Sequence, residues 1–172
     1  GALAETFVRK EFRDTVLWAG SLTTDADGVA EVPVTMPDQL TTFTLHAIAF
    51  DRDTRVGETS LNLVTAKRII VRLQSGRFFT EGDHSYVTVI AHNYFEAPQR
   101  LTVDLTAEGG LTLRQVKVRG EWSDYESGDP LEVTVPAGGE SRLDFRTTAE
   151  SPGEARLLAR ARGPRESDAL EL

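Results

Sequence analysis

The sequence predicts an all-β protein made of antiparallel β-sandwiches in tandem, of the fibronectin III or immunoglobulin-like kind. Three observations predict it. Apolar residues recur at every second position in most segments, clusters of Gly, Pro, Asp and Ser separate these segments, and no helical period lasts longer than one turn. Alternation of this kind places one face of a strand in a core and the other face in water.

The clearest alternation lies in 101–106, where Leu, Val and Leu alternate with Thr, Asp and Thr. The same pattern occurs in 131–135, 142–146 and 155–161. The last of these segments contains helix-forming residues, but its alternation and the Pro-Gly pair before it favour a strand. We therefore expect each segment to present one polar face to solvent.

Turn-forming clusters separate the predicted strands. Asp25-Ala26-Asp27-Gly28 predicts a hairpin between the segments on either side of it. Pro33 cannot donate to a β-ladder, so the segment that contains it is predicted to be an edge strand or to have its N–H position at Pro33 facing outward. Similar clusters of turn residues occur at 108–110, 127–130, 136–139 and 151–153.

One segment changes its phase. In 111–118 the apolar residues occupy odd positions at first and even positions later. One extra residue near Arg114–Gln115 would produce this change, which predicts a β-bulge there.

The domain boundary is expected at 65–68, which divides the chain into 1–66 and 67–172. The second part has the size of a complete sandwich, whereas the first part has strands for about one sheet only. In the first part either set of alternating residues in 42–51 could face the absent sheet, and Trp18 is expected in the core. The strands expected in the first part cover 15–24, 29–35, 42–51 and 57–64.

Composition excludes several classes of function. The chain has 172 residues, and 27 acidic against 19 basic side chains give a net charge of −8. This charge argues against nucleic acid and against an anionic membrane surface as partners. No apolar run approaches the roughly 20 residues of a membrane helix, so no membrane insertion is expected. Gly1 opens the chain without Met or a leader, so we expect a segment of a longer protein.

No metal or cofactor site is expected. The chain has no Cys, which excludes disulfides, thiolate ligands and a Cys-based thioester within these residues. His84 and His92 are predicted on one strand, about 26 Å apart at 3.3 Å per residue, so they cannot share a metal. His46 has no His neighbour in sequence, and Asp25–Gly28 lacks the later ligands of a calcium loop.

No catalytic residues are expected, and we predict that the chain is not an enzyme. The chain has no Gly-x-Ser-x-Gly elbow and no phosphate-binding glycine pattern. The cluster 121–126 places Trp122 and Tyr125 among carboxylates. We expect an exposed loop in which one of the two rings packs back on the sandwich, and the alternative is a carbohydrate site.

The first half of the chain carries a more specific signal. The segment from Val8 to Trp18, VRKEFRDTVLW, resembles the "VRxxFxxTxxW" motif of the α2-macroglobulin family. Phe43 stands where the family usually has Trp, Arg13 where it often has Pro, and Asp83 where Glu is usual. Further segments that resemble the family follow in the same order at 27–30, 36–43, 56–58, 79–83 and 92–94.

The resemblance implies both an architecture and a role. Members of the family are large, multidomain, extracellular or periplasmic proteins built mainly from macroglobulin-like sandwiches. A protease cleaves an exposed bait region, the protein rearranges, and the protease is trapped, in many members through a Cys-Gly-Glu-Gln thioester. The matched block lies after the bait region and before the thioester domain. The resemblance thus implies that 1–66 ends one macroglobulin-like domain and that 67–172 is the whole of the next.

On this resemblance, the chain is a structural scaffold of an endopeptidase inhibitor. Its partners would be target proteases, through the full-length protein, and neighbouring domains of the same chain. The lack of Cys and the acidic composition suggest a bacterial member, secreted or in the periplasm or cell envelope. The alternative is an extracellular binding or adhesion sandwich, such as a carbohydrate-binding module, which would need Trp122 and Tyr125 exposed on one face.

Overall fold

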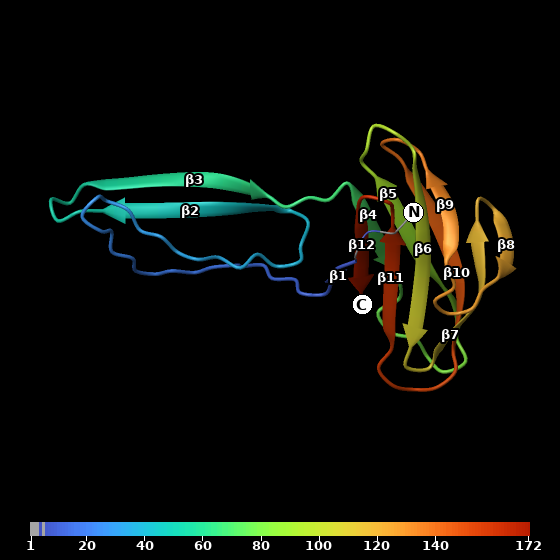
Figure 1. Ribbon diagram of the computed structural model, residues 1–172. Helices are drawn as coiled ribbons and strands as arrows, with labels where there is room; N and C mark the ends of the chain where they lie inside the picture. The colour runs from blue at the N-terminus through green and yellow to red at the C-terminus, as the bar shows by residue number, and fades with distance from the viewer. Residues whose placement is uncertain (1–3, 5) are drawn as a thin grey trace. The chain divides into compact units, whose positions relative to one another are not determined.

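The computed structural model describes residue 4 and residues 6–172. These residues form twelve β-strands and no helix, which confirms the predicted all-β class (Figure 1). Contacts within the chain divide it into two units. One unit is Glu11–Ala66, and the other contains Lys67–Leu172 together with the described residues up to Lys10. Each unit is described by itself below.

The larger unit is a sandwich of two five-stranded sheets, with neighbouring strands antiparallel except for the parallel pair β1–β12. The first sheet has the order β1 (Val8–Arg9), β12 (Ser167–Glu171), β11 (Arg156–Arg162), β6 (Gln99–Glu108), β9 (Leu131–Val135). The second has the order β4 (Ile69–Gln74), β5 (His84–Asn93), β10 (Glu140–Ala149), β7 (Leu111–Val118), β8 (Glu121–Asp124).

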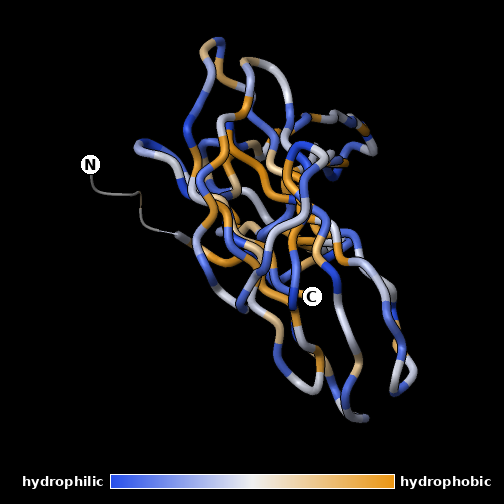
Figure 2. The backbone as a smooth tube through the Cα atoms, turned by 90° about the vertical axis from the view of Figure 1, so that its right-hand side faces the viewer, coloured by the Kyte–Doolittle hydropathy of each residue, from blue (hydrophilic) through white to orange (hydrophobic). Residues whose placement is uncertain are grey.

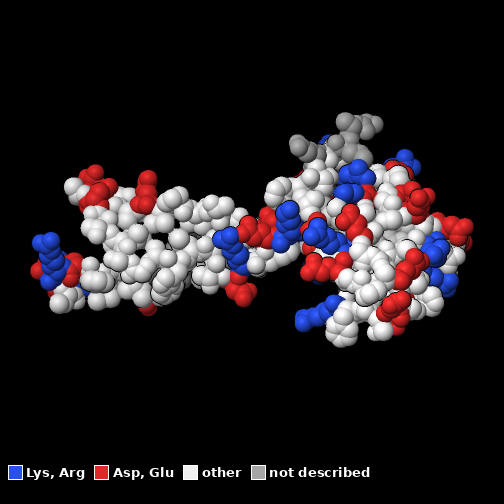
Figure 3. Space-filling view, turned by 90° about the horizontal axis from the view of Figure 1, so that it is seen from below, with Lys and Arg blue, Asp and Glu red and all other residues white. Residues whose placement is uncertain are grey.

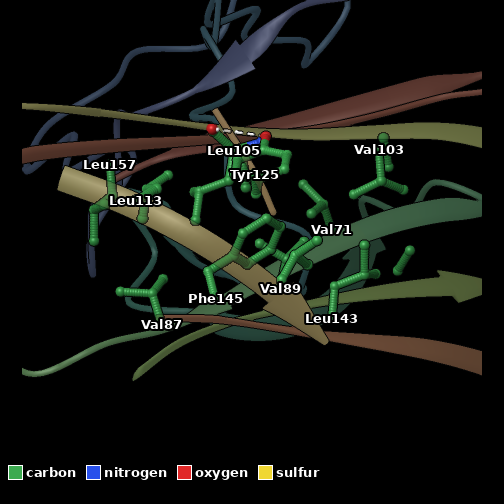
Figure 4. Close-up of a cluster of buried hydrophobic side chains, with 14 of the residues drawn as sticks. Val71, Val87, Val89, Val103, Leu105, Leu113, Tyr125, Leu143, Phe145 and Leu157 are labelled. Carbon is green, nitrogen blue, oxygen red and sulfur yellow. Dashed lines mark hydrogen bonds between the residues drawn. The ribbon is translucent and has the colours of Figure 1, made fainter. Parts of the chain in front are cut away.

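The core of this sandwich lies between its two sheets. Leu101, Val103 and Leu105 on β6 are fully buried, as the alternation predicted. Phe145 on β10 packs its ring against Tyr125 at 4.8 Å between ring centroids, in an edge-to-face arrangement (Figure 4). Apolar and polar residues alternate along the strands in Figure 2. Burying each such side chain stabilises the fold by about 1.5–3 kcal/mol, so this layer holds the sandwich together.

The predicted β-bulge is confirmed. On β10, Arg146 pairs with Gln115 of β7, but the next residue, Thr147, pairs with Leu113. Arg114 is therefore the extra residue. It lets Leu113 and Val116 both point into the core, although they are separated by an odd number of positions.

The smaller unit has only a two-stranded sheet, β2 (Thr42–Phe50) paired antiparallel with β3 (Val56–Val64). The turn between them, 51–55, is exposed to solvent. The Asp51 carboxylate accepts the N–H groups of Asp53 and Arg55 at 2.9 and 3.0 Å, and Thr54 has φ 62°.

Two strands expected in this unit are absent. The segments 15–24 and 29–35 have no strand in the structure, although the turn between them forms as predicted. There Asp25 N–H donates to Val29 O at 2.8 Å, and Gly28 takes φ 80°. The prediction of strands was wrong because alternation supplies an apolar face but not a partner backbone, and Pro33 also lacks an N–H.

The start of the chain also differs from the expected division at 66/67. Val8–Arg9, which that division assigned to the first part, forms β1 and pairs with Ala169 and Leu170 of β12. These two residues thus complete a sheet of the C-terminal sandwich. At the other end of the smaller unit, Ala66 is its last residue and Lys67 begins the sandwich.

Candidate functional site

The largest feature without a structural partner is one face of the β2–β3 sheet. The register pairs Phe43 with Leu63 and Leu45 with Leu61, so these four side chains share one face. Leu45 is 42% exposed and Leu61 58% exposed. We call the side chains on this side of the sheet the apolar face: Phe43, Leu45, Ala47, Ala49, Leu61 and Leu63.

The opposite face is polar around Thr44 and His46 and carries exposed apolar side chains nearer its ends, at Ile48, Phe50, Val56 and Val64. Thr44 Oγ1 donates to Asn62 Oδ1 at 3.0 Å, and His46 Nε2 lies 3.7 Å from Glu58 Oε2. Both pairs are exposed. The sequence left open which alternating set would face an absent sheet, and the register now indicates the odd-numbered set of β2.

Nothing in the described part of the unit covers this sheet. All nine residues of β3 are exposed, as are all residues of β2 except Phe43, which is half-buried. Figure 3 shows a largely uncharged surface over this unit, with charged side chains towards its ends. An isolated two-stranded sheet is marginally stable in water. The apolar face is therefore the kind of surface that a second layer, about 10 Å away, covers in a β-sandwich.

Trp18, in the same unit, also lacks a second layer to pack against. It was expected in the core, but its side chain is 88% exposed, so that expectation was wrong. A core requires two facing layers, and the described residues of this unit supply one sheet. Without a second layer, the large apolar side chains of Phe12 and Leu17 are exposed as well.

The aromatic cluster at 121–126 does not form a binding platform. Its first four residues are strand β8 rather than a loop, because Trp122 pairs with Lys117 in the β7 register. Tyr125 is 5% exposed and packs back on the core, as expected for one of the two rings. Trp122 stays outside with Arg146 at 4.4 Å from its ring centroid and Tyr86 at 5.9 Å.

The Tyr125 hydroxyl instead serves the backbone of β6. It accepts from Leu105 N–H at 2.9 Å and donates to Leu105 O at 3.0 Å. The β6–β9 pairing ends at Val103, so Leu105 has no partner strand on that side. Burial raises the pKa of the Tyr125 phenol, and the nearby Asp104 charge raises it further against the lowering effect of the backbone hydrogen bond.

The three histidines make separate contacts. His84 and His92 are both on β5, as predicted, where His84 contacts Thr148 Oγ1 at 3.0 Å and His92 Nδ1 lies 3.3 Å from Glu140 Oε2. Burial, and next the Arg72 charge, lower the pKa of His92 against the opposing effect of Glu140.

Among the described residues no three His, Cys, Asp or Glu side chains are grouped to hold a metal. The same residues contain no helix long and apolar enough to cross a bilayer.

The segments that resemble a known family prove to be structural positions. Asn93 is fully buried, and its amide donates to Ala97 O and Pro136 O at 2.9 Å and accepts from Phe95 N–H at 2.9 Å. Asp38 accepts from Glu11 N–H at 2.8 Å, from 27 positions away in sequence. These hydrogen bonds hold loops in place.

Comparison with known proteins now identifies the family. The model of the alpha-2-macroglobulin family matches residues 15–105, more than half of the chain. The chain belongs to the alpha-2-macroglobulin family. An alpha-2-macroglobulin homolog of Nostoc sp. is 25% identical over 172 residues, which cover 98% of this chain and 8% of that protein. The Deinococcus radiodurans homolog is 33% identical over 103 residues, covering 60% of this chain and 10% of that protein.

Solved alpha-2-macroglobulin structures share the fold. Trypsin-activated Escherichia coli alpha-2-macroglobulin superposes with a TM-score of 0.65 at 22% identity, covering 86% of this chain and 10% of that one. The elastase-activated form gives a TM-score of 0.65 at 21% identity, covering 95% and 15%. The chain thus spans about a tenth of the length of its relatives, and its β-sandwich is of the macroglobulin-like kind.

Proposed function

We propose that this chain is a structural scaffold segment of a bacterial, protease-trapping alpha-2-macroglobulin. The observation that carries the proposal is the pairing of a complete sandwich with a sheet whose apolar face is uncovered. A region built this way supports neighbouring domains through its surfaces. Family membership supplies the context, because the relatives are about ten times longer than the matched segment.

The two units then have different roles. In this proposal 67–172, completed by β1, is a whole macroglobulin-like domain, and 11–66, the larger share of the first part expected as 1–66, is the C-terminal portion of the preceding one. The second sheet of that preceding domain comes from elsewhere in the parent protein and packs on Leu45, Leu61 and their neighbours. Two-sheet packing of this kind would bury the odd-numbered side chains of β2 and leave Thr44 and His46 in solvent.

In this proposal the segment has no catalytic role. The partners are target proteases, engaged by the full-length protein, and the neighbouring domains of the same chain. The parent is placed outside the cytoplasm, in the periplasm, the cell envelope or the extracellular space. In the trapping cycle this segment contributes contacts that hold before bait cleavage and change after it, rather than a reactive group.

The test uses the full-length parent. Leu61→Asp places a charge on the apolar face, and Ser60→Asp places the same charge on the opposite face of the same strand. We expect Leu61→Asp to abolish or strongly reduce the capture of trypsin, measured as protection of a large protein substrate. Ser60→Asp should keep at least about half of the wild-type capture, since a surface change of this kind costs little.

Two outcomes would count against the proposal. Equal capture by both variants would mean that the apolar face carries no partner layer. Full capture by a parent from which this segment is deleted would mean that the scaffold role lies elsewhere. Circular dichroism and gel filtration on each variant distinguish loss of capture from loss of folding.

A further inference from the structure

The inference concerns a buried ionic cluster in the sandwich that the sequence did not reveal. Asp168 on β12 is fully buried, and Arg9 on β1 is 8% exposed. The Asp168 carboxylate accepts from Arg9 Nε at 2.8 Å, Arg9 Nη2 at 2.7 Å and Lys67 Nζ at 3.0 Å. Two cations from distant parts of the chain thus meet at one carboxylate.

The same ion pair closes the seam between the two sheets. β4 is an edge strand of the second sheet, and its partner β5 lies on one side only. On its other side, Val71 N–H donates to Asp168 Oδ2 at 2.9 Å, and Val71 O accepts from Arg9 Nη2 at 2.8 Å. Side chains of the first sheet therefore replace the backbone ladder that an edge strand lacks.

Glu166, two residues before Asp168, extends this seam. Its carboxylate accepts from Arg68 N–H at 2.8 Å and from Ile69 N–H at 3.3 Å. Consecutive backbone donors at the start of β4 are thus bound by the acidic residues at the start of β12. The geometry fixes the beginning of β4 against β12 by side-chain contacts alone.

The positions of the two cations in the chain indicate the role of the cluster. Arg9 ends β1, one residue before the chain leaves the sandwich, and Lys67 is the first residue after it returns. β1 has two residues, so its backbone pairing is short. We propose that Asp168 is a positioning residue that clamps both chain crossings, at Arg9 and at Lys67, to one point on the seam of the sandwich.

The clamp should act as a unit. Removing the Asp168 charge leaves Arg9 buried without a counter-ion, which is far more costly than breaking an exposed pair. It also takes from Lys67 a contact that holds the second crossing. A change at this one carboxylate should therefore loosen two segments separated by about 60 positions in sequence, without first melting the core between them.

The test is amide hydrogen exchange on the whole chain. In Asp168→Asn we expect amides at 8–10 and 67–71 to exchange at least about tenfold faster, because a hydrogen bond to a charged group is lost at both crossings. Amides in the middle of β5 and β10 should keep their protection relative to the wild type. Asp144→Asn, which removes a partly exposed carboxylate paired with Arg142 on β10, is the matched control and should leave both crossings unchanged.

A second variant separates the two crossings. Lys67→Met keeps the Arg9–Asp168 pair, so exchange should rise at 67–69 and stay unchanged at 8–10. The proposal is overturned if Asp168→Asn affects only one crossing, or if Asp144→Asn produces the same pattern. It is also overturned if Lys67→Met leaves 67–69 unchanged, a result that can be obtained even if Asp168→Asn does not fold.

Discussion

The strands β6 and β2 have nearly the same apolar pattern and opposite environments. On β6, Leu101, Val103 and Leu105 are fully buried between two sheets. On β2 the corresponding residues Leu45, Ala47 and Ala49 are exposed. The difference teaches that alternation specifies a strand with one apolar face, whereas burial depends on whether a second layer is present.

The largest effect should come from truncating matched apolar side chains in the two regions. Phe145→Ala should lower the free energy of unfolding of the sandwich by about 3–5 kcal/mol, because it leaves a cavity in a fully buried layer. Leu61→Ala on β3 should change the free energy of unfolding of the smaller unit by less than about 0.5 kcal/mol. Denaturant unfolding followed by Trp122 fluorescence, in a Trp18→Phe background, measures the sandwich, and unfolding followed by Trp18 fluorescence, in a Trp122→Phe background, measures the smaller unit. Comparable losses in the two variants would show that the apolar face is already covered.

A smaller difference in stability is expected between variants that remove one buried and one exposed hydroxyl group. Tyr125→Phe should cost about 1–3 kcal/mol, because the buried N–H of Leu105 loses its partner, while Leu105 O keeps the Gly128 N–H at 2.9 Å. Thr44→Val, which removes an exposed contact to Asn62, should cost less than about 0.5 kcal/mol. If the two variants lose the same stability, burial is not what distinguishes the two regions.

The raised pKa of Tyr125 adds a dependence on pH. The unfolded chain releases this phenolic proton near pH 10, while the folded chain keeps it to higher pH. Stability linked to Tyr125 should therefore be complete below about pH 10 and decrease as the pH rises further. The decrease should be shallower in Tyr125→Phe, and an identical slope in both proteins would contradict this assignment.

A weaker pH effect is expected from His92 at the acidic side. Its pKa is lowered in the folded sandwich, mainly by burial, so the unfolded chain binds this proton at a higher pH than the folded chain does. Stability should then fall as the pH drops through about 6.5. His92→Gln should reduce this fall in thermal melts between pH 7.5 and pH 5. A steeper fall in the variant would reverse the sign argued here.

The last prediction is that the isolated chain has no effect on a protease. The isolated chain, mixed with trypsin and a large protein substrate, should not protect the substrate. It has no Cys for a thioester, and methylamine should find no group to modify. Protection at equimolar amounts would mean that this segment inhibits proteases directly through one of its loops, contrary to the scaffold proposal.

Local sequence patterns predicted much of the sandwich. The change of phase around Arg114 located the bulge, and the alternation in 155–161 predicted β11 despite its helix-forming residues. Both predictions rest on the two-residue period of a strand, which short segments carry in full. The motifs shared with the alpha-2-macroglobulin family also pointed to the correct family, because their order along the chain was preserved.

Long-range charge pairing could not be predicted in the same way. Asp104 occupies the phase expected to face water, yet it is 1% exposed beneath Arg160 and Arg162 of β11. Asp168 is buried by Arg9, 159 residues away. A buried carboxylate is stable only with its cations in place, and nothing local in the sequence indicates which cations approach it. The only hint was that Arg9 lies in a motif shared with the family.

In the two-stranded unit, the strands at 42–50 and 56–64 were predicted, but two other segments were predicted wrongly for a different reason. Its segments 15–24 and 29–35 have strand-like composition, and Trp18 has the character of a core residue. Whether such segments form ladders depends on partner strands, and the described residues of the unit provide none. Sequence patterns describe what a segment could bury, whereas packing depends on the chain around it.

The hairpin β2–β3 also has a consequence for how the protein is made. In the described structure each of its strands has one hydrogen-bonded neighbour, so each leaves one edge open. Thr42–Phe50 contains no Asp, Glu, Lys, Arg, Pro or Gly, the residues that normally discourage strands of different molecules from joining. A newly synthesised copy with this strand uncovered would add to the edge of another copy and begin a fibrillar aggregate. Covering the open edge of β2 during folding would prevent this addition.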